Sequence, residues 1–206
     1  ASPHPICNMK KVLDIIYSAG SGGEFLTWTL GQQLPFVTQK AKVISSVNKW
    51  NLHGPTINCF NNQHLDRQGD TNWITDDKLI NLHRKHFYKL EDLSETKNSW
   101  QDWNSAIIVL CSTTLESADW VNKIKSKKLN NAVPTEIYDK LKIDQLLNGC
   151  HYYHIEPNIF WNSTKQVRIL FDWIETVFSV ELQVDDFVSF ANLWTKANLD
   201  ILQERV

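Results

Sequence analysis

The chain has 206 residues and a formal net charge of −2; hydrophobic and charged residues make up 42% and 21% of it. These are the values of a globular protein whose core is large enough for one domain over residues 1–206. The slightly acidic balance argues against a nucleic-acid partner, since general nucleic-acid binders are normally basic. No apolar run reaches the roughly 20 residues that a membrane span requires, so no membrane association is expected.

Residues 1–10 have no long apolar core and carry lysine only at their end, so they are interpreted as a loose N-terminal arm and not as a signal peptide. The cysteines are far apart and form no CxxC pair, which favours free thiols in a reducing compartment. A cytoplasmic location is the corresponding expectation. These cysteines are Cys7, Cys59, Cys111 and Cys150.

A strand, a glycine-rich turn and a helix are predicted between residues 11 and 34. The apolar run Val12–Tyr17 has the length of a strand buried on both faces. Gly20–Gly23, of sequence Gly-Ser-Gly-Gly, can adopt positive φ and let a ligand approach the backbone. Helical spacing begins at Glu24, so N–H groups and the positive end of the helix dipole should converge on an anion, most often a phosphate. The lysine of a standard P-loop is absent, and a tight turn without a ligand is the alternative.

The next segments are less regular. Residues 41–47 have the composition of a second strand. Residues 48–73 form a polar stretch without period, which indicates either a long functional loop or lid or a poorly ordered excursion. Residues 78–90 combine a helix-capping start with strand-like pieces and remain ambiguous between helix and strand. Within them His83 and His86 would share a helix face, a spacing that resembles a metal pair. No third ligand is obvious in the sequence, so no metal is expected.

The second half of the chain alternates again between strand and helix. Ala106–Cys111 is a clear buried strand, followed by a hydroxyl-rich loop and a helix with early acidic and late basic residues. Further helices are predicted over residues 134–147, from a Ser163 cap to residue 180, and from Asp186 to residue 202. Strands that alternate with helices predict an α/β fold, here three αβα layers around a mainly parallel sheet, with the glycine turn at the carboxyl ends of its strands.

Three blocks in this order resemble the sulfotransferase branch of the P-loop fold, including its short, divergent bacterial and phage members. In the first block, residues 18–26, four positions match the family pattern: Ser21, Gly22, Phe25 and Leu26. The second is a histidine-bearing segment followed by a strand, a loop and a helix. The third is C-terminal and carries Trp194 and Asn198.

The resemblance implies transfer of a sulfuryl group from a 3′-phosphoadenylyl sulfate donor to a hydroxyl acceptor. It implies that the turn binds the donor's 5′-phosphosulfate and the loop after Cys111 its 3′-phosphate, while His86 or His83 accepts the hydroxyl proton. Two cations of the family are missing, one at the Gly20 position and one after Cys111. Arg84 and Lys85 are the nearest candidates to replace them. The donor-binding candidates are Gly20, Ser21, Gly22, Gly23, Glu24, Phe25, Arg84, Lys85, Ser112, Thr113, Thr114 and Ser117.

Two other functions stay open. The fold could have lost its chemistry with its cations and now serve as a scaffold for binding or assembly. A small-molecule or nucleotide kinase is the third reading, which the missing lysine and the lack of a clear Mg²⁺-binding carboxylate disfavour. The sequence leaves open both the acceptor and the oligomeric state, including a homo-oligomer.

Overall fold

The computed structural model describes residues 10–31, 33, 36–38, 50–51, 54–55, 79–126 and 133–203. The arm over residues 1–9, the strand expected at 41–47 and most of the 48–73 loop lie outside these residues. The elements, in chain order, are β1 (Lys11–Tyr17), α1 (Gly23–Gly31), β2 (Phe36–Thr38), β3 (Trp50–Asn51), β4 (Gly54–Pro55), β5 (Ile80–His86), α2 (Glu91–Ser99), β6 (Asn104–Leu110), α3 (Leu115–Ser126), α4 (Lys140–Leu146), β7 (His151–Ile155), α5 (Pro157–Trp161), α6 (Thr164–Phe178) and α7 (Val184–Gln203).

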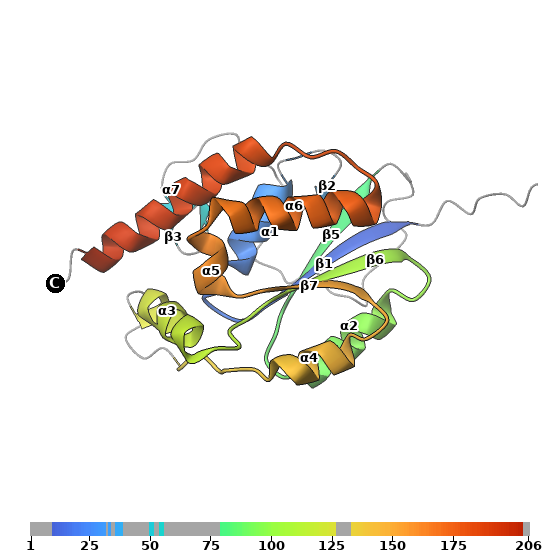
Figure 1. Ribbon diagram of the computed structural model, residues 1–206, viewed down its shortest axis with the longest axis horizontal. Helices are drawn as coiled ribbons and strands as arrows, with labels where there is room; N and C mark the ends of the chain where they lie inside the picture. Colours follow the sequence, from blue (N-terminus) through green and yellow to red (C-terminus); the bar gives the residue numbers. More distant parts are fainter. Residues whose placement is uncertain are drawn as a thin grey trace, which may run out of the picture.

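A parallel sheet forms the centre of the fold, in the strand order β2-β5-β1-β6-β7. Helices α1, α6 and α7 lie on one side of it and α2 and α4 on the other (Figure 1). The prediction of an α/β fold with a parallel sheet is thus confirmed, and β1 and β6 are adjacent parallel strands with Tyr17 opposite Leu110. The short strands β3 and β4 pair separately and antiparallel.

Alternation along β1 divides the core between the two faces of the sheet, because successive side chains of a strand point to opposite faces. Leu13, Ile15 and Tyr17 belong to the larger hydrophobic cluster, together with residues of α1, α5, α6 and α7. Ile16 belongs to the smaller cluster, with residues of α2 and α4. Both faces of β1 are therefore covered, which explains its nearly continuous apolar sequence.

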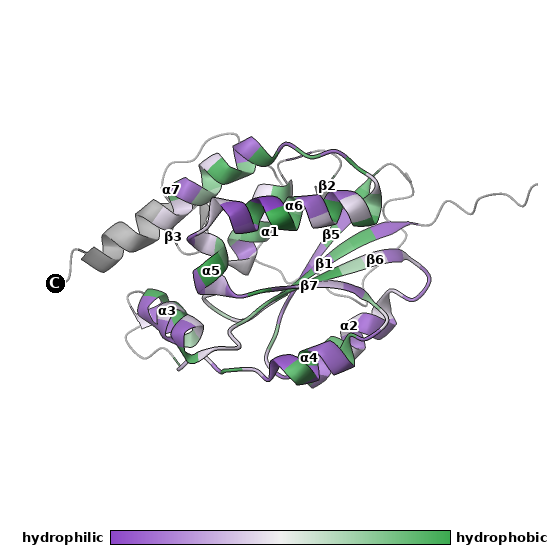
Figure 2. Ribbon diagram, viewed as in Figure 1, coloured by the Kyte–Doolittle hydropathy of each residue, from purple (hydrophilic) through white to green (hydrophobic). Residues whose placement is uncertain are grey.

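Helix α6 shows how the outer layer is held. Ser163 caps it by accepting a hydrogen bond from the backbone N–H of Gln166, as the sequence predicts. Its buried residues recur every three or four positions, and Figure 2 shows hydrophobic and hydrophilic residues alternating along this helix. Each such side chain contributes about 1.5–3 kcal/mol when fully buried. These residues are Val167, Leu170, Phe171, Ile174 and Phe178.

The helix expected over residues 134–147 begins later than the sequence predicts. Residues 133–139 are not helical, and α4 starts at Lys140 after Asp139, whose side chain caps it. The backbone N–H of Tyr138 donates to the carbonyl of Ser112 (2.9 Å), and that of Thr135 donates to the Asn122 side chain (2.6 Å). These bonds tie the segment across the carboxyl end of the sheet and outweigh its local helix propensity.

Candidate functional site

The connections of the sheet place a topological switch point between β1 and β6. From β1 the chain passes to β2 and returns to β5 on one side, whereas from β6 it continues to β7 on the other. In parallel sheets, ligands bind in the crevice outside the carboxyl ends of strands at such a point. The glycine turn and the hydroxyl-rich loop both begin there.

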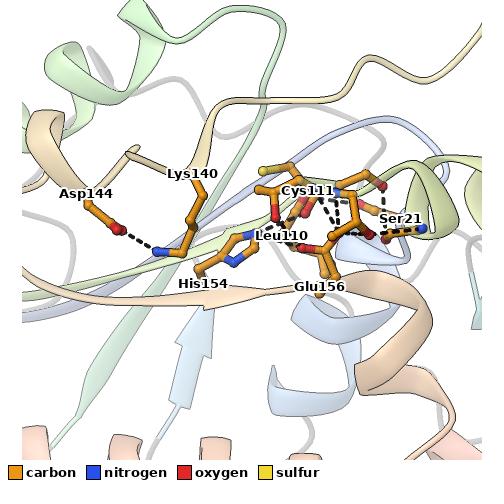
Figure 3. Close-up of polar contacts among 11 residues, drawn as sticks. Ser21, Leu110, Cys111, Lys140, Asp144, His154 and Glu156 are labelled. Carbon is orange, nitrogen blue, oxygen red and sulfur yellow. Dashed lines mark hydrogen bonds and ion pairs between the residues drawn. The ribbon is translucent and has the colours of Figure 1, made fainter. Parts of the chain in front are cut away.

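Two hydrogen bonds join the turn to β6. The backbone N–H of Ser18 donates to the carbonyl of Leu110 (2.9 Å), and the Ser21 hydroxyl donates to the Ser18 carbonyl (2.6 Å) and, more weakly, to the Leu110 carbonyl (3.4 Å). Figure 3 shows Ser21 beside Leu110 and Cys111. Gly20 and Gly22 have φ of +83° and +93°, which only glycine adopts readily. The structure therefore brings together the two segments to which the resemblance assigns the donor.

Side chains of the protein cover the glycines of the turn. A Cβ at Gly22 would lie 2.8 Å from the ring of Trp161, whose Nε1 donates to the Ser21 carbonyl (2.7 Å). A Cβ at Gly23 would lie 2.0 Å from Cγ of Tyr17. The glycines thus allow close packing within the protein as well as the backbone conformation of the turn.

An internal carboxylate occupies the loop after β6. Glu156, which follows β7, accepts hydrogen bonds from the backbone N–H of Thr113 (2.8 Å) and of Thr114 (3.3 Å) and from the Thr113 hydroxyl (2.6 Å). The Thr114 hydroxyl accepts from the N–H of Ser117 (3.2 Å) as a helix cap, and the buried hydroxyl of Ser112 donates to that of Ser117 (3.1 Å). All four residues expected to hold a 3′-phosphate therefore have partners inside the protein.

A row of polar side chains leads from this loop along the edge of the sheet (Figure 3). His154 Nε2 lies 3.0 Å from the carbonyl of Cys111 and 3.8 Å from Glu156 Oε2, and beyond it Lys140 pairs with Asp144. Burial lowers the pKa of His154, against the opposing effects of the Cys111 carbonyl and of Glu156. Burial also raises the pKa of the Cys111 thiol, which makes it a poor nucleophile.

We expect His154 to make the protein less stable in mild acid. Because its pKa is lower folded than unfolded, the unfolded chain binds more protons below about pH 6.5, the ordinary pKa of histidine. The contribution of His154 to the free energy of unfolding is therefore fully present above that pH. It is lost as the pH falls, by at most about 1.4 kcal/mol per pH unit. Urea unfolding between pH 7.5 and 5 should therefore show a flatter pH dependence for His154→Gln. The exposed His151→Gln is the control and should follow the wild type; equal slopes for all three proteins would contradict the assignment.

The two candidate proton acceptors lie on β5, so of the two alternatives for residues 78–90 the strand is correct, and His83 and His86 do not share a helix face. In β5, residues three apart point to opposite faces of the sheet. His83 is buried, with Nδ1 3.2 Å from Asp14 Oδ1, and Trp100 Nε1 donates to the other oxygen of Asp14 (2.8 Å). These contacts indicate a structural role for His83.

His86 lies near the turn, on the face opposite to His83. Its ring centroid is 4.6 Å from that of Tyr17, the residue that packs against Gly23. Tyr88, two residues further along the chain, is exposed, with its ring centroid 5.8 Å from that of His86. Of the two histidines, His86 is therefore the one within reach of a ligand at the carboxyl edge.

Of the two candidate cations, Arg84 approaches the turn and Lys85 does not. Arg84 is 2% exposed, and its Nη1 lies 3.4 Å from Oε1 of Glu24, the residue after Gly23. Lys85 points to the other face and pairs with Glu95 of α2 (3.2 Å). Arg84 thus neutralises the carboxylate that would otherwise repel a phosphate at the turn.

Sequence reasoning missed three residues that shape this site: Glu156, Trp161 and Lys125, whose Cγ would lie 2.5 Å from a Cβ at Gly20. Glu156 had one usable signal, its position directly after a strand at the ligand-binding edge. Lys125 belongs to a run of lysines that is typical of a solvated helix end, and Trp161 was one of many scattered tryptophans.

Comparison of the chain with protein-family models, with curated proteins and with solved structures found no match. In the part of the chain that the structure describes, no helix is long and apolar enough to cross a membrane, and no three histidine, cysteine, aspartate or glutamate side chains converge as metal ligands.

Proposed function

We propose that this chain is a sulfotransferase-like transferase that binds the anionic end of a 3′-phosphoadenylyl sulfate donor at the Gly20–Gly23 turn. The observation that carries the proposal is the meeting of the turn and the β6 loop at the switch point, through the hydrogen bonds to the Leu110 carbonyl. The first turn of α1 supplies backbone N–H donors there. Arg84 offsets the negative charge of Glu24.

The chemistry assigned to the site is displacement at sulfur. The oxygen of the acceptor hydroxyl forms a bond to sulfur, and the bond from sulfur to the bridging oxygen of the donor phosphate breaks. The leaving adenosine 3′,5′-bisphosphate takes the electron pair of that bond, and the hydroxyl proton passes to His86. Positive groups near the turn stabilise the negative charge of the transition state, the term that carries most of such a transfer.

Titration of the protein with adenosine 3′,5′-bisphosphate tests the donor assignment. We expect saturable binding that weakens as salt is added, because the contact is partly ionic. ATP should compete poorly, since a triphosphate requires more positive charge or Mg²⁺ than these residues offer. Tighter binding of ATP would favour the kinase, and no binding of either nucleotide would reject both enzymes.

The contacts of Glu156 favour a second candidate, a scaffold without catalysis. Its carboxylate takes the N–H groups of Thr113 and Thr114, which the resemblance assigns to the 3′-phosphate. In that case the loop between β6 and α3 is closed to outside anions, and the fold serves to bind or assemble with another macromolecule.

Glu156→Ala distinguishes the two functions. We expect it to lower the free energy of unfolding by about 1–3 kcal/mol, because the part-buried N–H and hydroxyl of Thr113 and the exposed N–H of Thr114 lose a carboxylate acceptor. If the carboxylate stands in for an external anion, sulfate should restore the stability of this variant far more than that of the wild type. Glu116→Ala, which removes an exposed acid from the same end of α3, is the control and should lose little. If the protein is a scaffold, Glu156→Ala should bind anions and the wild type should bind no bisphosphate. Bisphosphate binding by the wild type would contradict the scaffold.

A further inference from the structure

Lys125, in the last turn of α3, lies against the glycine turn. A Cβ at Gly20 would be 2.5 Å from Cγ and 2.8 Å from Cδ of Lys125. The stem of the lysine therefore fills the space that a side chain at position 20 would need. Gly20 is also the position at which the resembled family carries a basic residue.

The side chain of Lys125 is largely buried, and its ammonium group has no carboxylate partner among the described residues. The residue is 9% exposed, and its Nζ donates to the carbonyl of Val133 (2.6 Å) and weakly to the hydroxyl of Thr135 (3.4 Å), both uncharged. Within the described parts of the chain, no carboxylate lies within ion-pair distance of this Nζ. An ammonium has three N–H donors, so one remains for another acceptor.

A buried charge without a counter-ion is costly, and such groups are normally paired. Burial accordingly lowers the pKa of Lys125. An ordinary solvated lysine would extend its ammonium into water. The side chain of Lys125 instead packs against Gly20, at the carboxyl end of the sheet, where ligands bind in such folds. Because Cδ of Lys125 contacts Gly20 and Nζ is only two bonds further along, this ammonium lies near the turn at which an anion is expected.

We propose that Lys125 supplies the positive charge that the turn lacks in its own sequence, and that its counter-ion is a sulfate or phosphate group of the ligand. This inference rests on the proposed donor site and specifies its cation. Position 20 is glycine because a lysine from α3 occupies the place of the missing basic side chain. The shared chemistry is a tetrahedral oxyanion, from either inorganic sulfate or a nucleotide.

The test compares Lys125→Met with Lys123→Met. Methionine keeps an unbranched apolar stem over Gly20 and removes the charge. Lys123 is an exposed residue of the same helix, so Lys123→Met is a control with the same net charge as Lys125→Met. Affinities for inorganic sulfate and for adenosine 3′,5′-bisphosphate are measured for both variants and the wild type. NMR of the wild type follows the Lys125 side chain and the Gly20 amide during each titration.

We expect Lys125→Met to lose at least tenfold in affinity for both ligands, Lys123→Met to bind like the wild type, and the wild-type signals of Lys125 and Gly20 to shift with each ligand. Bisphosphate binding that is equal in all three proteins overturns the role of Lys125 but leaves the donor site intact. If sulfate shifts the Lys125 signals but the bisphosphate does not bind, the role of Lys125 as the cation of the turn is supported and the proposed function is rejected. If Lys125→Met does not fold, the wild-type sulfate titration decides, and the absence of a Lys125 shift overturns the inference.

Discussion

Replacing Asp14 with alanine is expected to lower the free energy of unfolding by about 2–6 kcal/mol, because two buried side chains lose their acceptor and each buried donor left unsatisfied costs about 1–3 kcal/mol. Asp14 is fully buried in the middle of β1 and accepts hydrogen bonds from both His83 and Trp100. Alanine leaves these donors inside the core without their acceptor. Urea unfolding measures the loss.

Two further variants complete this experiment. Asp119→Ala removes an exposed carboxylate from α3 and should change stability by less than about 0.5 kcal/mol. Asp14→Asn keeps one oxygen acceptor and should lose less than Asp14→Ala. A loss below about 1 kcal/mol for Asp14→Ala would contradict the structural role of His83 and return it to the candidates for proton acceptor.

Gly22→Ala is expected to cost about 2–5 kcal/mol. A residue other than glycine at φ +93° costs about 1–2 kcal/mol, and the new Cβ would lie 2.8 Å from the Trp161 ring, an overpacking that costs roughly 1–3 kcal/mol more. Gly149→Ala isolates the first contribution, because Gly149 has φ +82° and nothing within 4 Å of an added Cβ.

The difference between the two glycine variants measures how firmly Trp161 holds the turn. Equal losses would show that the indole yields easily and that the turn can open. The same contact means that Gly22→Val, a substitution that would block the approach of a ligand to the turn, also disturbs the fold. Substitutions at Lys125 are therefore the cleaner probe of the site.

The parts of the fold that could be predicted are those whose signal is local. The apolar run of β1, the glycines after it and the cap of α6 at Ser163 each have a physical cause within a few residues. β5 could not be assigned because its sequence, Ile-Asn-Leu-His-Arg-Lys-His, is polar for a buried strand. Two of its polar side chains contact partners far away in sequence, His83 with Asp14 and Arg84 with Glu24.

The candidate site, too, has one part that could be predicted from local sequence and one that could not. Its turn could be found from four small residues before a helix, but the side chains that surround the turn come from α3, β5 and α5. Glu156 binds Thr113, which is 43 residues away in the chain, and Lys125 packs against Gly20, which is more remote still. No local pattern encodes that distance.

The most direct test of the donor site is an NMR titration that maps where adenosine 3′,5′-bisphosphate binds. A donor site at the turn predicts that the backbone amide signals of residues 20–25 shift together and saturate, with the Lys125 side chain shifting in the same concentration range. Shifts confined to other surfaces, or none at millimolar ligand, would contradict a donor site at the turn and leave the scaffold as the function of this fold.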